Sequence, residues 1–400
     1  MGPLCLPRRT PKILRSGLLI AIVALAALVR PAGADPGLTD TEIVIGSCAA
    51  LEGPASFLGT QTVLGALAYL NAVNDQGGVH SRKIRLLSRN DGYEPDKTIA
   101  CVNQLIQQDK VFAMGFFVGT PTGAKVVSMA EAHKVPAIGF FTGAEILRTP
   151  VKRNVIHVRA SYYDEARAQV DILVGTLGMK KVAVFYQEDA FGVAVLEGVK
   201  IALKKHNLEP VALGTYPRNT MDIAQGMEQI KPAQPEAVVM VGTYAPLAEF
   251  VKRARADKWK SQFLTVSFVG TEAFAKAAGK DGEGVIITQV VPPPIRKDLP
   301  GVSRYLAALK KYFPEANPNF VSLEGFVDAM VLVEGLKQAG RELSREKLLT
   351  AIEGIRDLDL GIGMKASYSA TRHHAFDAVY YTILRDGEPT IVTDWKLVKK

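Results

Sequence analysis

The amino-acid sequence predicts an α/β protein with two lobes, each a parallel β-sheet wrapped by helices. Short apolar runs rich in β-branched residues alternate with longer segments of helical periodicity, which is typical of such sheets. The alternation runs through two successive series that share a design without obvious sequence repetition. The 366 residues that follow a 34-residue leader are also too many for one compact core, so we expect two domains.

The first 34 residues have the order of an export signal: basic residues, an apolar run and a cleavage site of small residues. The apolar run at 17–29 has 13 residues, too few to span a bilayer as a helix, and no later run is longer. No cysteine stands at the predicted cut after Ala34, so a lipid anchor lacks its attachment residue. We expect residues 1–34 to be a signal peptide that is removed, releasing a soluble protein into the periplasm.

The charge balance does not indicate a nucleic-acid partner. The chain carries a net charge of +8, but five basic residues and no acidic ones lie in the leader, which leaves +3. Only Cys48 and Cys101 remain once the leader is removed. The compartment permits a disulfide, but no spacing pattern indicates one, and we expect two free, buried thiols rather than a bridge.

Strands and helices can be assigned in order along the chain. The first series predicts strands at 42–48, 83–91, 111–117 and 136–141, with helices at 59–74, 96–108 and after Thr120. The second series predicts strands at 155–161, 180–187, 209–216, 237–244, 263–268 and 284–291, with helices at 164–177, 193–205, 223–230 and 245–256. Three helices follow at about 302–313, 319–338 and 344–353, and a hairpin turns at Asp386-Gly387.

We expect the chain to cross between the lobes three times and so to form a hinge. The three late helices are predicted to return to the first lobe, and the final strands to join the second. This division gives residues 35–158 with 290–357 to lobe 1, and residues 159–289 with 358–400 to lobe 2.

The loops at the carboxyl ends of the strands are the expected ligand site, because helix N-termini point inward there. The segment FFVGTPTGAK, residues 116–125, is such a junction. Its spacing is not that of a nucleotide P-loop, but backbone N–H groups at a helix start favour an anion such as a carboxylate, and Thr120 and Thr122 add hydroxyl donors. The alternative is a plain helix cap with Pro121 at the first helical position.

These loops do not indicate an enzyme. None of the six histidines lies in a crevice loop beside a Ser or Cys that it could activate. His373 and His374 lack a third metal ligand and are assigned to a surface turn. The acidic pairs at 164–165 and 188–189 each open a helix and are interpreted as capping residues. No G-x-G-x-x-G follows the first strand, so we expect neither a metal nor a cofactor.

Several linked segments carry a family resemblance: GPASFLG near the first strand, NDQGGV before the second, DGYEP after it, then VGTPTGA, VPAIGFFTGAE and VFYQEDAFG. Together they resemble the type I periplasmic binding proteins of the Leu/Ile/Val-binding group, the receptors of branched-chain amino-acid-type ABC importers. The resemblance implies a hinged receptor that closes on a small-molecule ligand and is recognised by an ABC permease of the inner membrane. We expect a monomer without enzymatic activity.

The resemblance also implies which residues bind the ligand. Its carboxylate-binding positions fall on Gly119, Thr120, Phe141, Thr142 and Gly143, and its other contact positions fall on Phe191, Tyr244, and Phe57 or Leu58. Tyr162 is added because its hydroxyl needs a partner.

One position departs from the family pattern. Where amino-acid receptors of this group place an acid for the ligand's ammonium, this chain presents Ser267, with Glu272 nearby but out of register. An aromatic or aliphatic carboxylate therefore competes with an amino acid as the expected solute. A ligand-sensing module for a signalling partner and a secreted α/β enzyme are the alternative functions.

Overall fold

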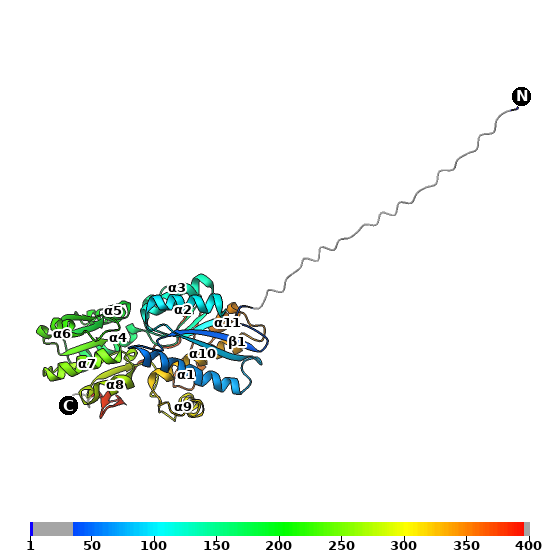
Figure 1. Ribbon diagram of the computed structural model, residues 1–400. Coiled ribbons are helices and arrows are strands. Elements are labelled where there is room, and N and C mark those ends of the chain that lie inside the picture. The colour runs from blue at the N-terminus through cyan, green and yellow to red at the C-terminus, as the bar shows by residue number, and fades with distance from the viewer. Residues whose placement is uncertain (3–34, 396–400) are drawn as a thin grey trace. The chain divides into compact units, whose positions relative to one another are not determined.

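The computed structural model describes residues 1–2 and 35–395, so the predicted leader lies outside the described residues except for its first two. Residues 35–395 form two main β-sheets flanked by helices (Figure 1). One sheet has five strands in the order β2-β1-β3-β4-β5, and the other has seven in the order β14-β13-β10-β9-β8-β6-β7. We call the first sheet with its helices lobe 1, and the second lobe 2. The predicted fold class is confirmed.

The first sheet is entirely parallel and consists of β1 (Glu42–Ala49), β2 (Lys83–Asn90), β3 (Ala113–Val118), β4 (Ala137–Phe141) and β5 (Val155–Ile156). Strands β1, β3 and β4 are buried along nearly their whole length, as expected for parallel strands covered on both faces. Helices α2 (Pro95–Asn103) and α3 (Thr120–His133) cover one face, and α1 (Ser56–Asp75) and α10 (Phe320–Gln338) cover the other (Figure 1). Helix α9 (Pro300–Tyr312) packs on α1, and α11 (Arg345–Gly354) packs on α10.

The close packing of α1 on α10 depends on two glycines. A Cβ atom at Gly65 of α1 would lie 1.8 Å from the carbonyl oxygen of Ser322, and one at Gly325 of α10 would lie 2.1 Å from that of Thr62. Only residues without a side chain allow the two backbones to approach this closely.

The second sheet is mixed. Strands β6 (Val182–Gln187), β7 (Ala212–Tyr216), β8 (Ala237–Val241), β9 (Gln262–Thr265) and β10 (Ile286–Gln289) are parallel. The hairpin of β13 (Tyr380–Arg385) and β14 (Glu388–Ile391) joins antiparallel to β10 and turns at Asp386-Gly387, which confirms its prediction. Helices α4 (Tyr162–Val170) and α5 (Ala190–Lys204) cover one face. Helices α6 (Ala224–Ile230), α7 (Tyr244–Ala256) and α8 (Thr271–Ala278) cover the other, and α8 was not predicted.

One strand of the second series and one predicted lobe assignment differ from the structure. The strand expected to open the second series is β5, which pairs with β4 of the first sheet and so lies in lobe 1, to which residues 35–158 were assigned. The segment from 358 to 376, which we assigned to lobe 2, carries the two-stranded sheet of β11 (Leu358–Asp359) and β12 (Lys365–Ala366) and packs in the core of lobe 1. The Tyr368 hydroxyl donates to the His157 carbonyl at 2.9 Å. The third crossing therefore lies just before β13 rather than at 358.

We had expected His373 to lie on a surface turn, and this prediction is wrong. Its side chain is buried, with Nε2 3.0 Å from a Glu353 carboxylate oxygen and Nδ1 3.0 Å from the Val155 carbonyl oxygen. It therefore anchors the segment before β13 to β5.

Cys48 and Cys101 form a disulfide with a Cα–Cα distance of 6.2 Å, so the expectation of two free thiols is wrong. Both residues are buried, as expected. The bond joins the end of β1 to α2, two elements that the fold packs together although they are far apart in sequence. Among residues 1–2 and 35–395, no helix combines the length and the apolar character needed to span a bilayer.

Candidate functional site

The predicted site residues lie at the carboxyl ends of strands in both sheets. Gly119 and Thr120 follow β3, and Phe141 to Gly143 follow β4. In lobe 2, Phe191 lies in the first turn of α5 after β6, and Ser267 follows β9. Loops at this edge of parallel sheets, next to helix N-termini, are the usual position of a ligand.

The N-terminus of α3 has no side-chain cap, and its first residues are buried. The turn before it requires glycine, because Gly119 has a φ of +98° and a Cβ there would lie 2.1 Å from a ring carbon of Tyr93. The hydroxyls of Thr120 and Thr142 lie 2.7 Å apart and form a hydrogen bond. The β3 and β4 loops thus place two hydroxyls together beside the positive end of a helix dipole.

Tyr162 completes this group of polar side chains. Its backbone N–H donates to the Gly143 carbonyl at 2.7 Å, and its ring is fully buried. Burial raises the pKa of Tyr162, and the positive charge of Arg159 partly opposes that effect. The Tyr162 hydroxyl has no geometrically satisfactory partner among the described residues. A buried hydroxyl without a partner is costly, so Tyr162 is a candidate ligand-binding residue.

Aromatic rings from both lobes surround Phe268, a residue that the sequence prediction did not include among the ligand contacts. Its ring centroid lies 4.4 Å from that of Phe191, 5.4 Å from that of Phe141 and 6.0 Å from that of Tyr93. All four rings are buried. They continue one apolar core cluster from lobe 1 into lobe 2, so the interior of the site is apolar apart from the hydroxyls.

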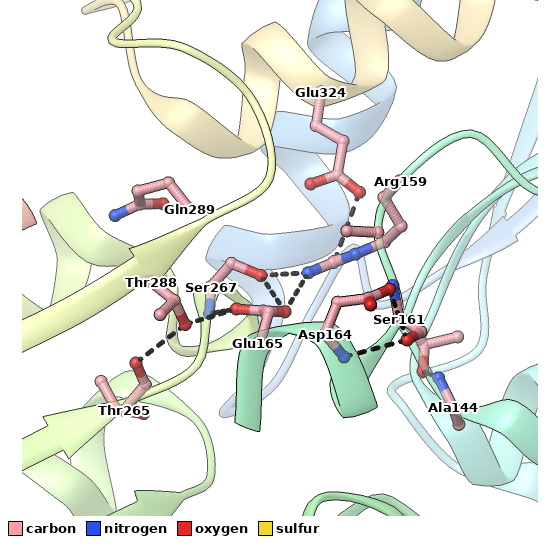
Figure 2. A network of polar contacts seen from close by, with 12 residues as sticks. Ala144, Arg159, Ser161, Asp164, Glu165, Thr265, Ser267, Thr288, Gln289 and Glu324 are labelled. Carbon is pink, nitrogen blue, oxygen red and sulfur yellow. Dashed lines mark hydrogen bonds and ion pairs between the residues drawn. The ribbon is translucent and has the colours of Figure 1, made fainter. Parts of the chain in front are cut away.

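A buried polar network lies directly behind these rings, and Figure 2 shows its members. Arg159, on the first crossing between the lobes, donates through Nη2 to Glu165 of α4 at 3.0 Å. Its Nη1 forms an ion pair with Glu324 of α10 at 3.3 Å. The guanidinium carbon lies 5.1 Å from the Phe141 ring centroid and 5.7 Å from that of Tyr162. Arg159 therefore contacts both lobes and the aromatic walls of the site.

Ser267 belongs to this network, and its hydroxyl is not free. The hydroxyl accepts a hydrogen bond from Arg159 and donates one to Glu165 at 2.9 Å, while the Ser267 backbone N–H donates to Glu165 at 2.8 Å (Figure 2). Ser267 was predicted to contact the ligand, and in the structure it forms hydrogen bonds with Glu165.

The charges of the network shift the pKa values of its members. Burial alone would lower the pKa of Arg159, but Glu324 and Glu165 outweigh that effect and raise it. Burial raises the pKa of Glu324 to about 7 and, with the charge of Glu324, raises that of Asp328 well above its usual range. Arg159 is accordingly a permanent cation, whereas the Glu324 carboxylate is close to accepting a proton near neutral pH.

Two predicted residues lie apart from this inner group. Phe57 and Tyr244 form an edge-to-face ring pair at 6.0 Å and line a cavity of about 1210 Å³ between the lobes, together with Glu272. Thr120, Phe141, Thr142, Tyr162 and Phe191 do not line that cavity. Leu58 is buried and faces Gly270 of lobe 2, where a Cβ would lie 2.7 Å from a Leu58 methyl carbon. We call the cavity lined by Phe57, Tyr244 and Glu272 the outer cavity.

Glu272 connects the two lobes at the outer cavity. Its Oε1 accepts a hydrogen bond of 3.0 Å from the backbone N–H of Phe320, the first residue of α10, while its Oε2 has no partner among the described residues. Burial raises the pKa of Glu272 to about 7. Glu94 and Arg218 form a second link between the lobes, at 2.7 Å.

The acidic residues that were interpreted as helix caps have two different roles. Asp164 forms a capping box with Ser161, and Asp189 accepts the N–H groups of Phe191 and Gly192, so both cap their helices. Glu165 does not cap α4 but pairs with Arg159. In the part of the chain that the structure describes, no group of three or more His, Cys, Asp or Glu side chains is placed to hold a metal ion.

Comparison with known proteins gives a consistent result. The family model for periplasmic binding proteins matches residues 42–388. A possible leucine/isoleucine/valine-binding protein from Rhodopirellula baltica has a solved structure with 33% identity and a TM-score of 0.86, over 90% of this chain and 98% of that chain. A substrate-binding periplasmic protein from Ralstonia solanacearum has 28% identity and a TM-score of 0.82, over 86% and 98% of the two chains.

A curated relative, Leu/Ile/Val-binding protein homolog 7 of Brucella abortus (strain 2308), is 25% identical over 334 residues, covering 79% of this chain and 82% of the relative. Such relatives are ligand-binding proteins and not enzymes, which confirms that prediction. The chain therefore belongs to the periplasmic binding protein family, as a two-lobed type I member of its Leu/Ile/Val-binding group.

Proposed function

We propose that this protein is the solute receptor of an ABC importer and captures a small carboxylate-bearing molecule by closing its lobes. The family match supports a ligand-binding role in the periplasm, and the predicted signal peptide supports export. Closure about a hinge is the expected transition for a molecule of this architecture, because three connections join the lobes and the candidate ligand residues come from both.

The carboxylate end of the ligand is assigned to the group formed by Thr120, Thr142 and Tyr162. The observation that carries this assignment is the buried Tyr162 hydroxyl, which has no hydrogen-bond partner within residues 1–2 and 35–395 and lies beside Thr142 at the uncapped start of α3. Hydroxyl donors at a helix N-terminus suit an anion better than a neutral group. The plain helix cap considered as an alternative lacks its side-chain hydrogen bond.

The test is a thermal-shift screen of amino acids, aromatic acids and aliphatic acids, followed by calorimetry of any binder. A donor to a carboxylate contributes about 1.5–3 kcal/mol, so Tyr162→Phe should weaken binding at least tenfold. The stability of the ligand-free protein should change little, since the hydroxyl makes no hydrogen bond to any residue that the structure describes. Tyr163→Phe on the same helical turn is the control. Unchanged affinity in Tyr162→Phe would refute the assignment.

A further inference from the structure

We infer that the buried pair of Arg159 and Glu165 makes the site select carboxylic acids that carry no α-ammonium group. This inference rests on the proposed function and adds the chemical class of the ligand. An α-ammonium group lies two bonds from its carboxylate carbon, so it needs an acceptor close to the Thr120, Thr142 and Tyr162 hydroxyls. Glu165, three residues after Tyr162 on α4, is an acid whose charge acts on the Tyr162 hydroxyl.

Glu165 has no capacity left for a ligand. Its Oε1 accepts from Arg159 Nη2 at 3.0 Å and from the Ser267 hydroxyl at 2.9 Å. Its Oε2 accepts from the Ser267 N–H at 2.8 Å and from the Thr288 hydroxyl at 2.6 Å. A carboxylate has about four lone-pair positions, and these four donors occupy them. Glu165 is also fully buried.

Arg159 adds a fixed positive charge at the same place. Its guanidinium lies against the rings of Phe141 and Tyr162, and its Nε has no hydrogen-bond partner among the described residues. Glu165 and Glu324 compensate its charge, but the unpaired Nε–H is a donor that suits an anion and gives an ammonium group no acceptor. A buried ammonium that lacks an acceptor and faces a guanidinium is strongly disfavoured.

Among the other acids around the site, Glu324 forms an ion pair with Arg159 at 3.3 Å. Asp164 accepts from Ser161 and pairs with Arg167 at 2.8 Å, and Asp189 caps α5. Glu272 keeps one oxygen without a partner, but it lies in the outer cavity, which none of the inner site residues lines.

The surroundings of the carboxylate also define the body of the ligand. Phe141, Phe191, Phe268 and Tyr93 offer only ring faces and edges, except for the Tyr93 hydroxyl, which accepts a hydrogen bond from Gln187 at 3.1 Å. An apolar or aromatic body packs against such rings without leaving a polar group unpaired. The structure therefore favours an aromatic or aliphatic monocarboxylate over the amino acid of the same skeleton.

The experiment compares matched pairs by calorimetry on the wild-type protein: 3-phenylpropanoate with L-phenylalanine, and 4-methylpentanoate with L-leucine. The acid that lacks the ammonium should bind at least tenfold more tightly, which corresponds to about 1.4 kcal/mol. Equal or tighter binding of the amino acids would overturn this inference while leaving the proposed function intact. Binding of none of the four at millimolar concentration would instead overturn the proposed carboxylate receptor.

Variants test whether Arg159 and Glu165 cause the preference for acids without an ammonium group. Arg159→Gln removes the cation and frees one acceptor position on Glu165 Oε1, so the preference for the acid over the amino acid should narrow at least tenfold. If that variant does not fold, Ser267→Ala frees an acceptor position by a smaller change and should act in the same direction. Arg167→Gln is the matched control, because Arg167 pairs with Asp164 on the exposed side of the same helix. A preference that is unchanged in the first two variants would contradict the assigned role.

Discussion

Replacing Glu272 with glutamine should make ligand binding tighter at pH 8 and remove most of its pH dependence. Glu272 lies on α8 of lobe 2, and its Oε1 accepts the Phe320 N–H of lobe 1 at 3.0 Å. Burial raises its pKa from the ordinary 4.5 to about 7, and Glu388 adds to that effect. We expect the group to be hydrated, with its ordinary pKa, when the lobes are apart. Closure then favours the protonated carboxyl group.

The sign and size of the effect follow from these two pKa values. The contribution of Glu272 protonation to the free energy of closure is fully present below pH 4.5 and is lost as the pH rises through about 7. At about 1.36 kcal/mol per pKa unit, burying the ionised group costs about 3 kcal/mol. Affinity should therefore fall about tenfold between pH 6 and pH 8 as an upper limit. The substituted amide keeps an acceptor oxygen for Phe320 but carries no charge to bury.

The assay is calorimetry of one ligand at pH 6, 7 and 8 on wild type and variant. The difference between them isolates Glu272, because Glu324, whose pKa is also raised to about 7, is present in both. Glu272→Ala provides a second comparison, since it leaves the Phe320 N–H unpaired and should bind about tenfold more weakly than the glutamine variant at every pH. Glu315→Gln, exposed at the same cavity, is the control. Weaker binding by Glu272→Gln at pH 8, or the wild-type pH profile in that variant, would refute the reasoning.

Two further predictions concern the links that hold the fold and the closed lobes. Replacing Cys48 and Cys101 together with alanine opens a loop with a sequence separation of 53, and the free energy of unfolding measured by urea denaturation should fall by about 4 kcal/mol; a loss below about 1 kcal/mol would contradict a stabilising disulfide. Glu94→Gln weakens the partly exposed pair with Arg218 across the lobes, so ligand affinity should fall about two- to fivefold with unchanged stability of the ligand-free protein; an effect on thermal stability alone would show that the pair does not act on closure.

The order of strands and helices could be predicted because each is a local pattern. The predicted strand at 136–141 matches β4 (Ala137–Phe141), and the hairpin turn falls where Asp386-Gly387 placed it. Helix α8 was missed because its eight residues span little more than two turns, too few for a reliable periodicity. Local patterns therefore determine the elements but become weak when an element is short.

Tertiary pairings could not be predicted from the same patterns. The disulfide depends on α2 packing against the end of β1, and the third crossing depends on Tyr368 reaching the His157 carbonyl. Neither contact leaves a periodic signal in the sequence. The same applies to β5, whose two residues join the first sheet although their position suggested the second series.

The sequence could bring Thr120 and Thr142 together because loop position and residue type suffice to identify them, and their contact with a ligand stays a prediction. The ion pair behind them was missed because Glu165 follows Asp164 in a helix start, where acids usually interact with the dipole. Asp164 alone forms the capping box with Ser161, which leaves Glu165 to pair with Arg159. Two adjacent acids at a helix start can therefore have different roles, and only their partners distinguish them.

The position of Arg159 links ligand chemistry to lobe closure. The residue lies on the first crossing, pairs with Glu165 of lobe 2 at 3.0 Å and with Glu324 of lobe 1 at 3.3 Å, and contacts a ring from each lobe. A ligand carboxylate at Thr142 and Tyr162 would lie close to the same guanidinium, whose carbon is 5.7 Å from the Tyr162 ring centroid. Its negative charge would then offset a cation that both lobes share, and this stabilisation is largest when the lobes are together. The ammonium of an amino acid would weaken this stabilisation of the closed lobes. Selectivity against amino acids and closure of the lobes would then both depend on Arg159.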